Sequence, residues 1–235
     1  MRGGGNYAIV LYKSHGTCYN REKRGKKRGC NMAYDCEKLT RRLTAEGFTV
    51  SRFEREEDAA AWLCGELAGQ SVGIGGSMTV EQLGLYDRLC AAGCTVHWHW
   101  RQPGGETLRR AAEAQVYISS ANAIAESGEI INIDGSGNRV AALGYGHERI
   151  VIVAGTNKIA PDYATALARA RNIAAPLNAR RLSRKTPCAL CEPDAMRCYD
   201  CASPDRICRE LSVLLQRPSS IPHADVVLID RPLGY

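Results

Sequence analysis

Short apolar segments alternate with helix-like segments along most of the chain, and this alternation constrains the fold more than any other feature. The apolar segments have the length of strands and lie at residues 49–53, 71–75, 94–100, 116–120, 128–134, 149–155, 210–216 and 224–230. The helix-like segments lie at residues 35–48, 54–69, 77–93, 104–115 and 160–182, the last broken near Pro176. Strands joined through helices favour βαβ units. The sequence therefore predicts an α/β fold with an open, mainly parallel sheet flanked by helices.

The positive charge of the chain is concentrated at its N-terminal end. The net charge is +6, but residues 1–31 carry eight Lys/Arg and one Glu, which leaves the rest of the chain at −1. A nearly neutral body offers no long-range field for a polyanion, so nucleic acid is not expected as a partner. No apolar run approaches the roughly 18 residues of a membrane span, so no membrane partner is expected either. We expect a cytoplasmic protein whose thiols stay reduced.

The basic leader, residues 1–31, is predicted to be non-native or disordered. Residues 21–29 read REKRGKKRG, and all four of these residue types have codons made of purines alone. A purine-rich run shortly before Met32 has the form of a translated ribosome-binding site, so translation is expected to start at Met32. A disordered basic tail is the alternative, since runs of like charge are commonly disordered.

The first candidate ligand site is the segment VGIGGSMTVEQLG, residues 72–84, which has the pattern of a strand, a glycine turn and a helix. Gly75 and Gly76 would let the backbone approach a ligand closely. Ser77 stands at the start of the helix, where free amides and the helix dipole favour a phosphate or a carboxylate. An ordinary tight turn between a strand and a helix explains the same glycines.

The second candidate is the polar segment 119–143, which lies between apolar strands. Its polar side chains fall in or beside turns, where binding residues tend to collect; they are Asn122, Glu126, Asn132, Asp134, Asn138 and Arg139. Asn138 and Arg139 are expected to bind the same small anion as the glycine turn. The pairs Asp134-Gly135 and Gly137-Asn138 are also plain hairpin signals.

The segment CTVHWHW, residues 94–100, places His97 and His99 on one face of a strand. Two histidines at this spacing could hold a metal, but no third ligand lies nearby in the sequence. A half-buried strand is the preferred interpretation.

Five of the eleven cysteines fall within residues 188–208, in the order C-x2-C-x6-C-x2-C-x6-C. Two CxxC pairs separated by six residues indicate a centre with four thiolate ligands. Zinc and an iron–sulfur cluster both take four cysteines, so the spacing leaves the metal open. A disulfide and an unmetallated group of thiols are the alternatives. The segment interrupts the strand–helix alternation and is expected to form an inserted lobe at about residues 183–209.

Several segments, in order along residues 32–235, resemble those of one family. They are VGIGGSMTVEQLGLYDRL, AIAESGEIINIDGSGNRVAAL, VAGTNKI, NIAAPLNARRL, KTPC, CYDCASPDRIC and VVLIDRPLGY. Together they resemble the LUD-domain proteins, the lactate-utilisation family, and in particular its short stand-alone bacterial members. The resemblance implies a single domain over residues 32–235 with a fold similar to the NagB/RpiA/CoA-transferase group.

The resemblance also implies a role in the oxidation of lactate or a related organic acid, alongside iron–sulfur partner proteins. It implies a metal site with a 4Fe-4S cluster as the expected cofactor and zinc as the alternative. The implied ligands are Cys188, Cys198, Cys201 and Cys208, and the longer insertion ALCEPDAMR makes Cys191 the alternative ligand.

Three functions stay open at this point, and with them whether the protein is an enzyme. The leading hypothesis is a protein of organic-acid utilisation that binds a small carboxylate or phosphate and an iron–sulfur centre. The second is a transferase or isomerase with a structural zinc, in which Glu126 is catalytic by analogy with coenzyme A transferases. The third is a non-catalytic accessory protein that senses iron or redox state through its thiols.

Overall fold

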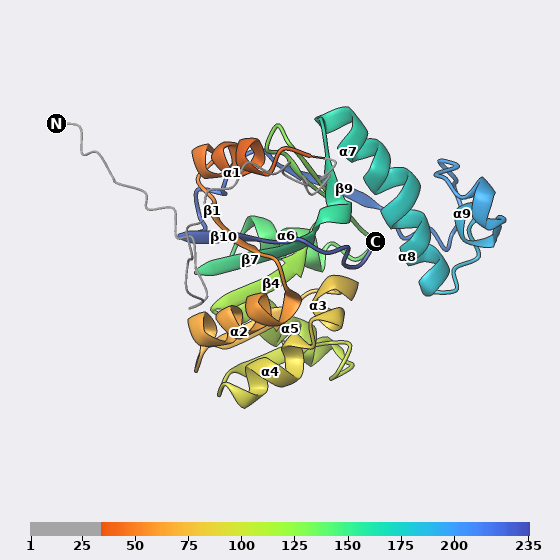
Figure 1. Cartoon of the computed structure of the whole chain (residues 1–235). Helices are drawn as coiled ribbons and strands as arrows, with labels where there is room; N and C mark the ends of the chain where they lie inside the picture. Colours follow the sequence, from red (N-terminus) through yellow and green to blue (C-terminus); the bar gives the residue numbers. More distant parts are fainter. Residues whose placement is uncertain (1–33) are drawn as a thin grey trace, which may run out of the picture.

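The computed structural model describes residues 34–235, and its centre is a six-stranded sheet (Figure 1). The strand order is β1-β10-β7-β4-β2-β3, and every neighbouring pair is parallel. The strands are β1 (Thr49–Phe53), β2 (Ser71–Ile74), β3 (Thr95–Trp98), β4 (Val116–Ser120), β7 (Arg149–Gly155) and β10 (His223–Ile229). This confirms the expected open parallel sheet. The predicted leader and the predicted start at Met32 lie outside the described residues.

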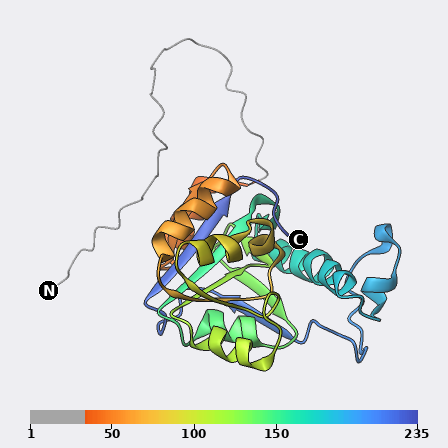
Figure 2. The ribbon, with the colours of Figure 1, turned by 90° about the horizontal axis from the view of Figure 1, so that it is seen from below.

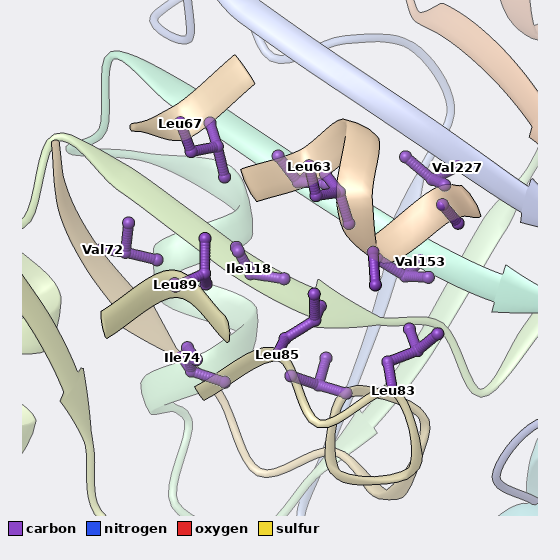
Figure 3. Close-up of a cluster of buried hydrophobic side chains, with 14 of the residues drawn as sticks. Leu63, Leu67, Val72, Ile74, Leu83, Leu85, Leu89, Ile118, Val153 and Val227 are labelled. Atoms are coloured by element: carbon purple, nitrogen blue, oxygen red, sulfur yellow. The ribbon is translucent and has the colours of Figure 1, made fainter. Parts of the chain in front are cut away.

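Helices cover both faces of this sheet, as expected when parallel strands are joined through helices. On one face, α2 (Glu56–Leu67) and α4 (Leu85–Ala91) pack through buried leucines on the side chains of five strands. Figure 3 shows part of this cluster, with Leu63, Leu85 and Leu89 among the labelled side chains. On the other face lie α1 (Cys36–Ala45), α5 (Gly105–Glu113) and α6 (Asn138–Gly144). Strand β4 contributes Ile118 to the first cluster and Tyr117 to the second, because successive strand residues point to opposite faces.

A second, smaller sheet lies beside the first. Its order is β8-β5-β6-β9, with β5 (Ala123–Ala125), β6 (Ile130–Asp134), β8 (Ile159–Ala160) and β9 (Glu210–Leu214). The pair β5–β6 and the pair β6–β9 are antiparallel, whereas β5–β8 is parallel. Helix α7 (Tyr163–Arg169) packs on it through small side chains such as Ala166. The strands expected near 128–134 and 210–216 therefore exist, but in a sheet of their own.

Two local predictions were wrong. The segment 77–93 was expected to form one helix, but Gly84, at a φ of +59°, divides it into α3 (Met78–Gln82) and α4. The hairpin signals at 134–138 lead instead into α6. There the Asp134 carboxylate accepts the backbone N–H groups of Gly135, Ser136 and Gly137 at 2.7, 3.1 and 3.2 Å, which turns the chain into the helix.

The segment 160–182 forms α7, a π-helical turn (Ala170–Ala174) and α8 (Ala175–Arg181). The turn directly precedes Pro176, whose missing N–H interrupts the helical hydrogen bonding. From the end of α8, the segment 183–209 extends away from the sheets around α9 in both views and returns to them at its end (Figures 1 and 2). This segment, the cysteine lobe, contains α9 (Pro187–Leu190) and a 3₁₀ turn (Pro193–Ala195) but otherwise little regular structure. None of the helices formed by residues 34–235 is long and apolar enough to cross a membrane.

Candidate functional site

Four neighbouring strands of the parallel sheet end at one cavity of about 590 Å³. Gly76 follows β2, His99 follows β3, Ser120 ends β4 and Lys158 follows β7, and all four residues line the cavity. From β2 the chain leads to β3 on one side, whereas from β4 it leads to β7 on the other. In open α/β sheets, ligands bind outside the carboxyl ends of the strands at such a divergence. The cavity has the volume of a small-molecule site.

The glycine turn after β2 forms one wall of the cavity through Gly76 and Ser77. Gly75 lies behind this wall, where a Cβ atom would stand 2.9 Å from the Tyr117 hydroxyl and 3.1 Å from Cγ of Arg139. The Ser77 hydroxyl accepts the Val80 N–H at 3.2 Å and caps α3. Because α3 has only five residues, the dipole expected from one long helix is largely lost. Attraction for an anion must therefore come from side chains.

Arg139, at the start of α6, contributes positive charge that is held rigidly by the protein. Its guanidinium donates to the Ile133 carbonyl at 2.6 Å and to the Asn122 side-chain oxygen at 3.3 Å, and it also bonds to the Asn132 side chain. Its Nε lies 3.5 Å from a carboxylate oxygen of Asp134. Burial lowers the pKa of Arg139 and Asp134 raises it. Arg139 thus forms part of the cavity wall. Its guanidinium already donates hydrogen bonds to protein acceptors, so it contributes mainly charge to the cavity.

Lys158 lies in the 3₁₀ turn after β7 and is 4 % exposed. Its Nζ donates to Oγ of Ser120 at 3.1 Å and to the carbonyl of Ala121 at 2.9 Å. No carboxylate within residues 34–235 forms an ion pair with it. Burial, followed by the charges of Arg169 and Arg139, lowers the pKa of Lys158 to about 7. The cavity therefore contains an amine whose charge nothing in this part of the chain offsets.

The position of Lys158 depends on segments far away in the sequence. Arg169 of α7 donates to the carbonyls of Asn157 and Asn122 at 2.6 and 2.5 Å. The side chain of Asn157 bonds to the backbone of Leu233 at 3.0 Å and of Gly234 at 3.1 Å. The turn that carries Lys158 is thus fixed between α7 and the segment that follows β10.

His99 and Trp100, which follow β3, line the outer part of the cavity. The ring of Trp100 stacks on that of buried Trp98 with centroids 5.2 Å apart, and the Arg181 guanidinium lies 4.7 Å from its centroid. Burial lowers the pKa of His99, and Asp134 raises it. The His99 Nδ1 atom is buried and has no hydrogen-bond partner among the described residues. Strand β3 ends at Trp98, two residues earlier than expected, and His99 lies just beyond its end at the cavity.

Positive side chains outnumber negative ones around the cavity. The cations are Arg139, Lys158, Arg181, Arg184, Arg206 and Arg209, and the acids are Asp134 and Asp205. Both acids are engaged, Asp134 as described and Asp205 by the backbone N–H of Lys185 at 2.9 Å. The Arg184 guanidinium makes no hydrogen bond or ion pair with any residue from 34 to 235. This surplus favours an anionic ligand.

The structure brings together most of the residues expected at the ligand site. Gly76, Ser77, Asn138 and Arg139 line the same cavity, and Gly75 lies directly behind them. Sequence reasoning missed Lys158 and the cavity role of His99. Lys158 lies shortly after the strand-like segment 149–155, and His99 lies near the end of the segment 94–100. A position at the carboxyl end of a predicted parallel strand was the signal that could have identified both as site residues.

Glu126 is not among the residues that line the cavity. It lies in the turn after β5, where its carboxylate accepts the Asp35 N–H at 3.1 Å and pairs with Nζ of Lys38 at 3.1 Å. The structure therefore does not bring Glu126 to the candidate ligand site.

The five thiols of the cysteine lobe are half-buried and unpaired. Guanidinium groups approach two of them, with Arg180 3.7 Å from the sulfur of Cys191 and Arg171 3.7 Å from that of Cys198. Thiolates are ligands that suit zinc and iron–sulfur clusters, and nearby guanidinium groups suit a negatively charged centre. The positions of the thiols do not form such a site, because no three His, Cys, Asp or Glu side chains within residues 34–235 are placed to hold a metal ion. The four-thiolate site, with Cys188, Cys198, Cys201 and Cys208, stays a prediction.

Comparisons with known proteins give a family and one structural relative. The chain is similar to a crystal structure of a DUF162 family protein from Deinococcus radiodurans, with a TM-score of 0.47 and 10% sequence identity over 82% of this chain and 94% of that chain. No curated protein sequence matches it. The family model of the LUD domain matches residues 36–228, which is most of the chain. The chain therefore belongs to the LUD-domain family.

Proposed function

We propose that this protein takes part in the utilisation of lactate or a related organic acid and that its cavity binds the acid as an anion. Membership of the LUD-domain family supports a function related to lactate utilisation in general. One observation carries the finer proposal. Lys158 is buried at the cavity without a carboxylate partner in the described chain, among a surplus of arginines.

The argument from Lys158 is electrostatic. A buried ammonium group that lacks a counter-charge destabilises the folded protein, because desolvation is not offset by pairing. A bound carboxylate would supply the missing charge, and unpaired Arg184 could hold it with two parallel hydrogen bonds. Binding of an acid would then raise the pKa of Lys158 and stabilise the protein.

Calorimetric titration at about pH 6, with lactate, pyruvate and inorganic phosphate as separate probes, tests this proposal. We expect at least one probe to bind wild-type protein and Lys158→Met to weaken its binding about tenfold or more, which corresponds to about 1.4 kcal/mol. Lys185→Met is the matched control, because Lys185 is exposed and does not line the cavity. Equal affinities for wild type and Lys158→Met, or no binding of any probe at millimolar concentration, would contradict the proposal.

The cysteine lobe is proposed to hold an iron–sulfur cluster of the 4Fe-4S type through Cys188, Cys198, Cys201 and Cys208, with Cys191 as the alternative ligand. The number of thiols and the guanidinium groups near two of them support this assignment. The lobe would have to rearrange to gather four sulfurs, which is common because metal binding and local folding are coupled. When bound, such a cluster supplies one-electron transfer, with iron–sulfur proteins as the proposed electron partners.

Anaerobic purification followed by iron, sulfide and zinc analysis tests the cluster. We expect a coloured protein with stoichiometric iron and acid-labile sulfide, and loss of both in Cys198→Ser. Cys90→Ser is the control, because Cys90 is an exposed cysteine of α4 outside the lobe. A colourless protein with one zinc would instead make the lobe a structural zinc site. The alternative with catalytic Glu126 is favoured by no observation, since Glu126 pairs with Lys38 outside the cavity.

A further inference from the structure

We propose that Lys158 is a nucleophile that forms an imine with the carbonyl group of a small 2-oxo acid bound in the cavity. The inference rests on the proposed function and narrows its ligand class to acids that carry a ketone or aldehyde next to the carboxylate. It also assigns the cavity a covalent step, which anion binding alone does not require.

The surroundings of Nζ are those of a reactive amine and not of a structural cation. Its two protein partners, the Ser120 hydroxyl and the Ala121 carbonyl, both accept hydrogen bonds and fix Nζ at the carboxyl end of β4. Neither partner carries a charge that would hold Lys158 as an ammonium group. Lys158 lines the cavity, so its side chain borders the space that a ligand would occupy.

The other lysines in the described part of the chain differ from Lys158 in this respect. Lys38 pairs with Glu126 at 3.1 Å, and its side chain is 54% exposed. Lys185 is exposed to solvent in the cysteine lobe. Neither lysine lines the cavity, so these two lysines serve as internal controls for any reaction at Lys158.

Only a neutral amine attacks a carbonyl carbon. Proteins make lysine neutral at physiological pH by desolvation and by neighbouring cations. Both causes act on Lys158, whose pKa is lowered to about 7 by burial and by Arg169 and Arg139. A pKa in this range leaves a substantial share of the Lys158 side chains neutral at pH 7, compared with less than about 0.1% of an ordinary lysine.

The remaining groups of the cavity match the other parts of a 2-oxo acid. The surplus of arginines favours its carboxylate. The ring of His99 lies in the same cavity, and burial lowers its pKa, so near pH 7 it is available to accept a proton. A carboxylate, a carbonyl and a proton carrier can thus be accommodated beside one amine.

The step balances without any further reactant. The lone pair of Nζ forms a C–N bond to the carbonyl carbon while the C=O π bond breaks, and a proton moves from nitrogen to oxygen to give a carbinolamine. Protonation of the hydroxyl group by solvent then lets water leave, and a protonated imine remains. The net reaction consumes one proton, releases one water and transfers no electrons. Hydrolysis of the imine reverses it.

Reductive trapping of the wild-type protein, compared with two lysine variants, tests the inference. The protein is incubated with pyruvate and borohydride at about pH 7, digested, and mapped by mass spectrometry. We expect one reduced pyruvate per chain on Lys158, with Lys38 and Lys185 unmodified, and no adduct with lactate, which has no carbonyl group. Lys158→Arg should abolish the adduct, and Lys185→Met should leave it unchanged. Trapping should increase as pH rises through about 7, where Lys158 loses its proton.

The outcomes separate this inference from the proposed function. If calorimetry detects lactate or pyruvate at the cavity but Lys158 carries no adduct, the imine is excluded and anion binding stands. If the adduct is spread equally over Lys38, Lys158 and Lys185, the reaction is nonspecific and the inference fails. If neither binding nor adduct is found, both proposals fail.

Discussion

Burial of the Lys158 ammonium destabilises the folded protein, because no carboxylate within residues 34–235 offsets its charge. In the unfolded chain the same group would keep its ordinary pKa of 10.5, whereas in the folded chain its pKa is about 7. Between these two values the unfolded chain binds a proton that the folded chain does not. The free energy of unfolding therefore rises with pH across this interval. Below about pH 7 both states hold the proton, so the destabilisation is complete there and does not change with pH.

We expect Lys158→Met to remove that contribution. Chemical denaturation at about pH 7 and about pH 9 should show the wild type gaining more stability with pH than the variant. The upper bound is about 1.4 kcal/mol for each pH unit. Lys185→Met should keep the wild-type pH dependence. Parallel profiles for wild type and Lys158→Met would mean that the folded protein does not shift this pKa.

Gly75 offers a second test at the residue scale. A Cβ atom at this position would lie 2.9 Å from the Tyr117 hydroxyl and 3.1 Å from Arg139, so Gly75→Ala should displace Arg139 and lower the free energy of unfolding by about 1–3 kcal/mol. Gly65→Ala is the control. Gly65 lies inside α2 with no neighbour within 4 Å of an added Cβ, so alanine there should raise the stability by about 0.5–1 kcal/mol. If urea denaturation gave the same change in the free energy of unfolding for Gly75→Ala and Gly65→Ala, Gly75 would not be packed tightly against Arg139 as described.

At the scale of elements, local patterns predicted most strands but not the short helices. The segment 116–120 forms β4 with the expected bounds because its first three residues, Val116, Tyr117 and Ile118, are β-branched or aromatic and favour a strand. The helical periodicity of 77–93 continues across Gly84, so only the left-handed backbone there reveals the break. In the same way, the pair Asp134-Gly135 has the composition of a hairpin turn. Only the structure shows that the Asp134 carboxylate accepts three backbone N–H groups and directs the chain into α6.

The same distinction explains which site residues could be predicted. Gly76 and Ser77 belong to a turn and Arg139 directly follows one, and the composition of both turns is visible in a window of a few residues. Lys158 becomes a site residue only because α7 and the segment after β10 bury it, and these contacts join positions far apart in the chain. No local pattern contains that burial. The second sheet was missed for a similar reason, since β6 pairs with β9 across a long separation.

Helix caps supply the prediction at this scale. Ser77 caps α3 and also lines the cavity, whereas Asp162 caps α7 by accepting the Thr165 N–H at 2.7 Å and does not line it. Ser77→Ala and Asp162→Ala should each lower the free energy of unfolding by about 1 kcal/mol. Only Ser77→Ala should also change the affinity for a small acid in calorimetry. A change in affinity caused by Asp162→Ala would show that the cavity responds to stability in general.

At the scale of the whole molecule, the cysteine lobe and the sheets differ in how firmly their backbone is held. Residues 183–209 contain only one short helix and a 3₁₀ turn, whereas the central strands are buried and paired on both sides. We expect limited trypsin digestion of the native protein to cut the described part of the chain first after Arg184, Lys185 or Arg197. Mass spectrometry of the first fragments checks this. Early cleavage within the six-stranded sheet would contradict it.

The end of the cysteine lobe is also a wall of the cavity. Residues 204–207 and Arg209 line the cavity, the N–H of Arg209 donates to the Asp134 carbonyl at 2.8 Å, and Gly135 fits only because it lacks a Cβ, which would stand 2.7 Å from the Ile207 carbonyl. If the lobe holds the proposed metal, its rearrangement would therefore move groups that line the cavity proposed to bind the acid. Thermodynamic linkage makes this coupling reciprocal, so the factor by which a metal changes ligand affinity is the factor by which the ligand changes metal affinity. A ligand affinity measured on this protein has a definite meaning only for a stated metal content of the lobe.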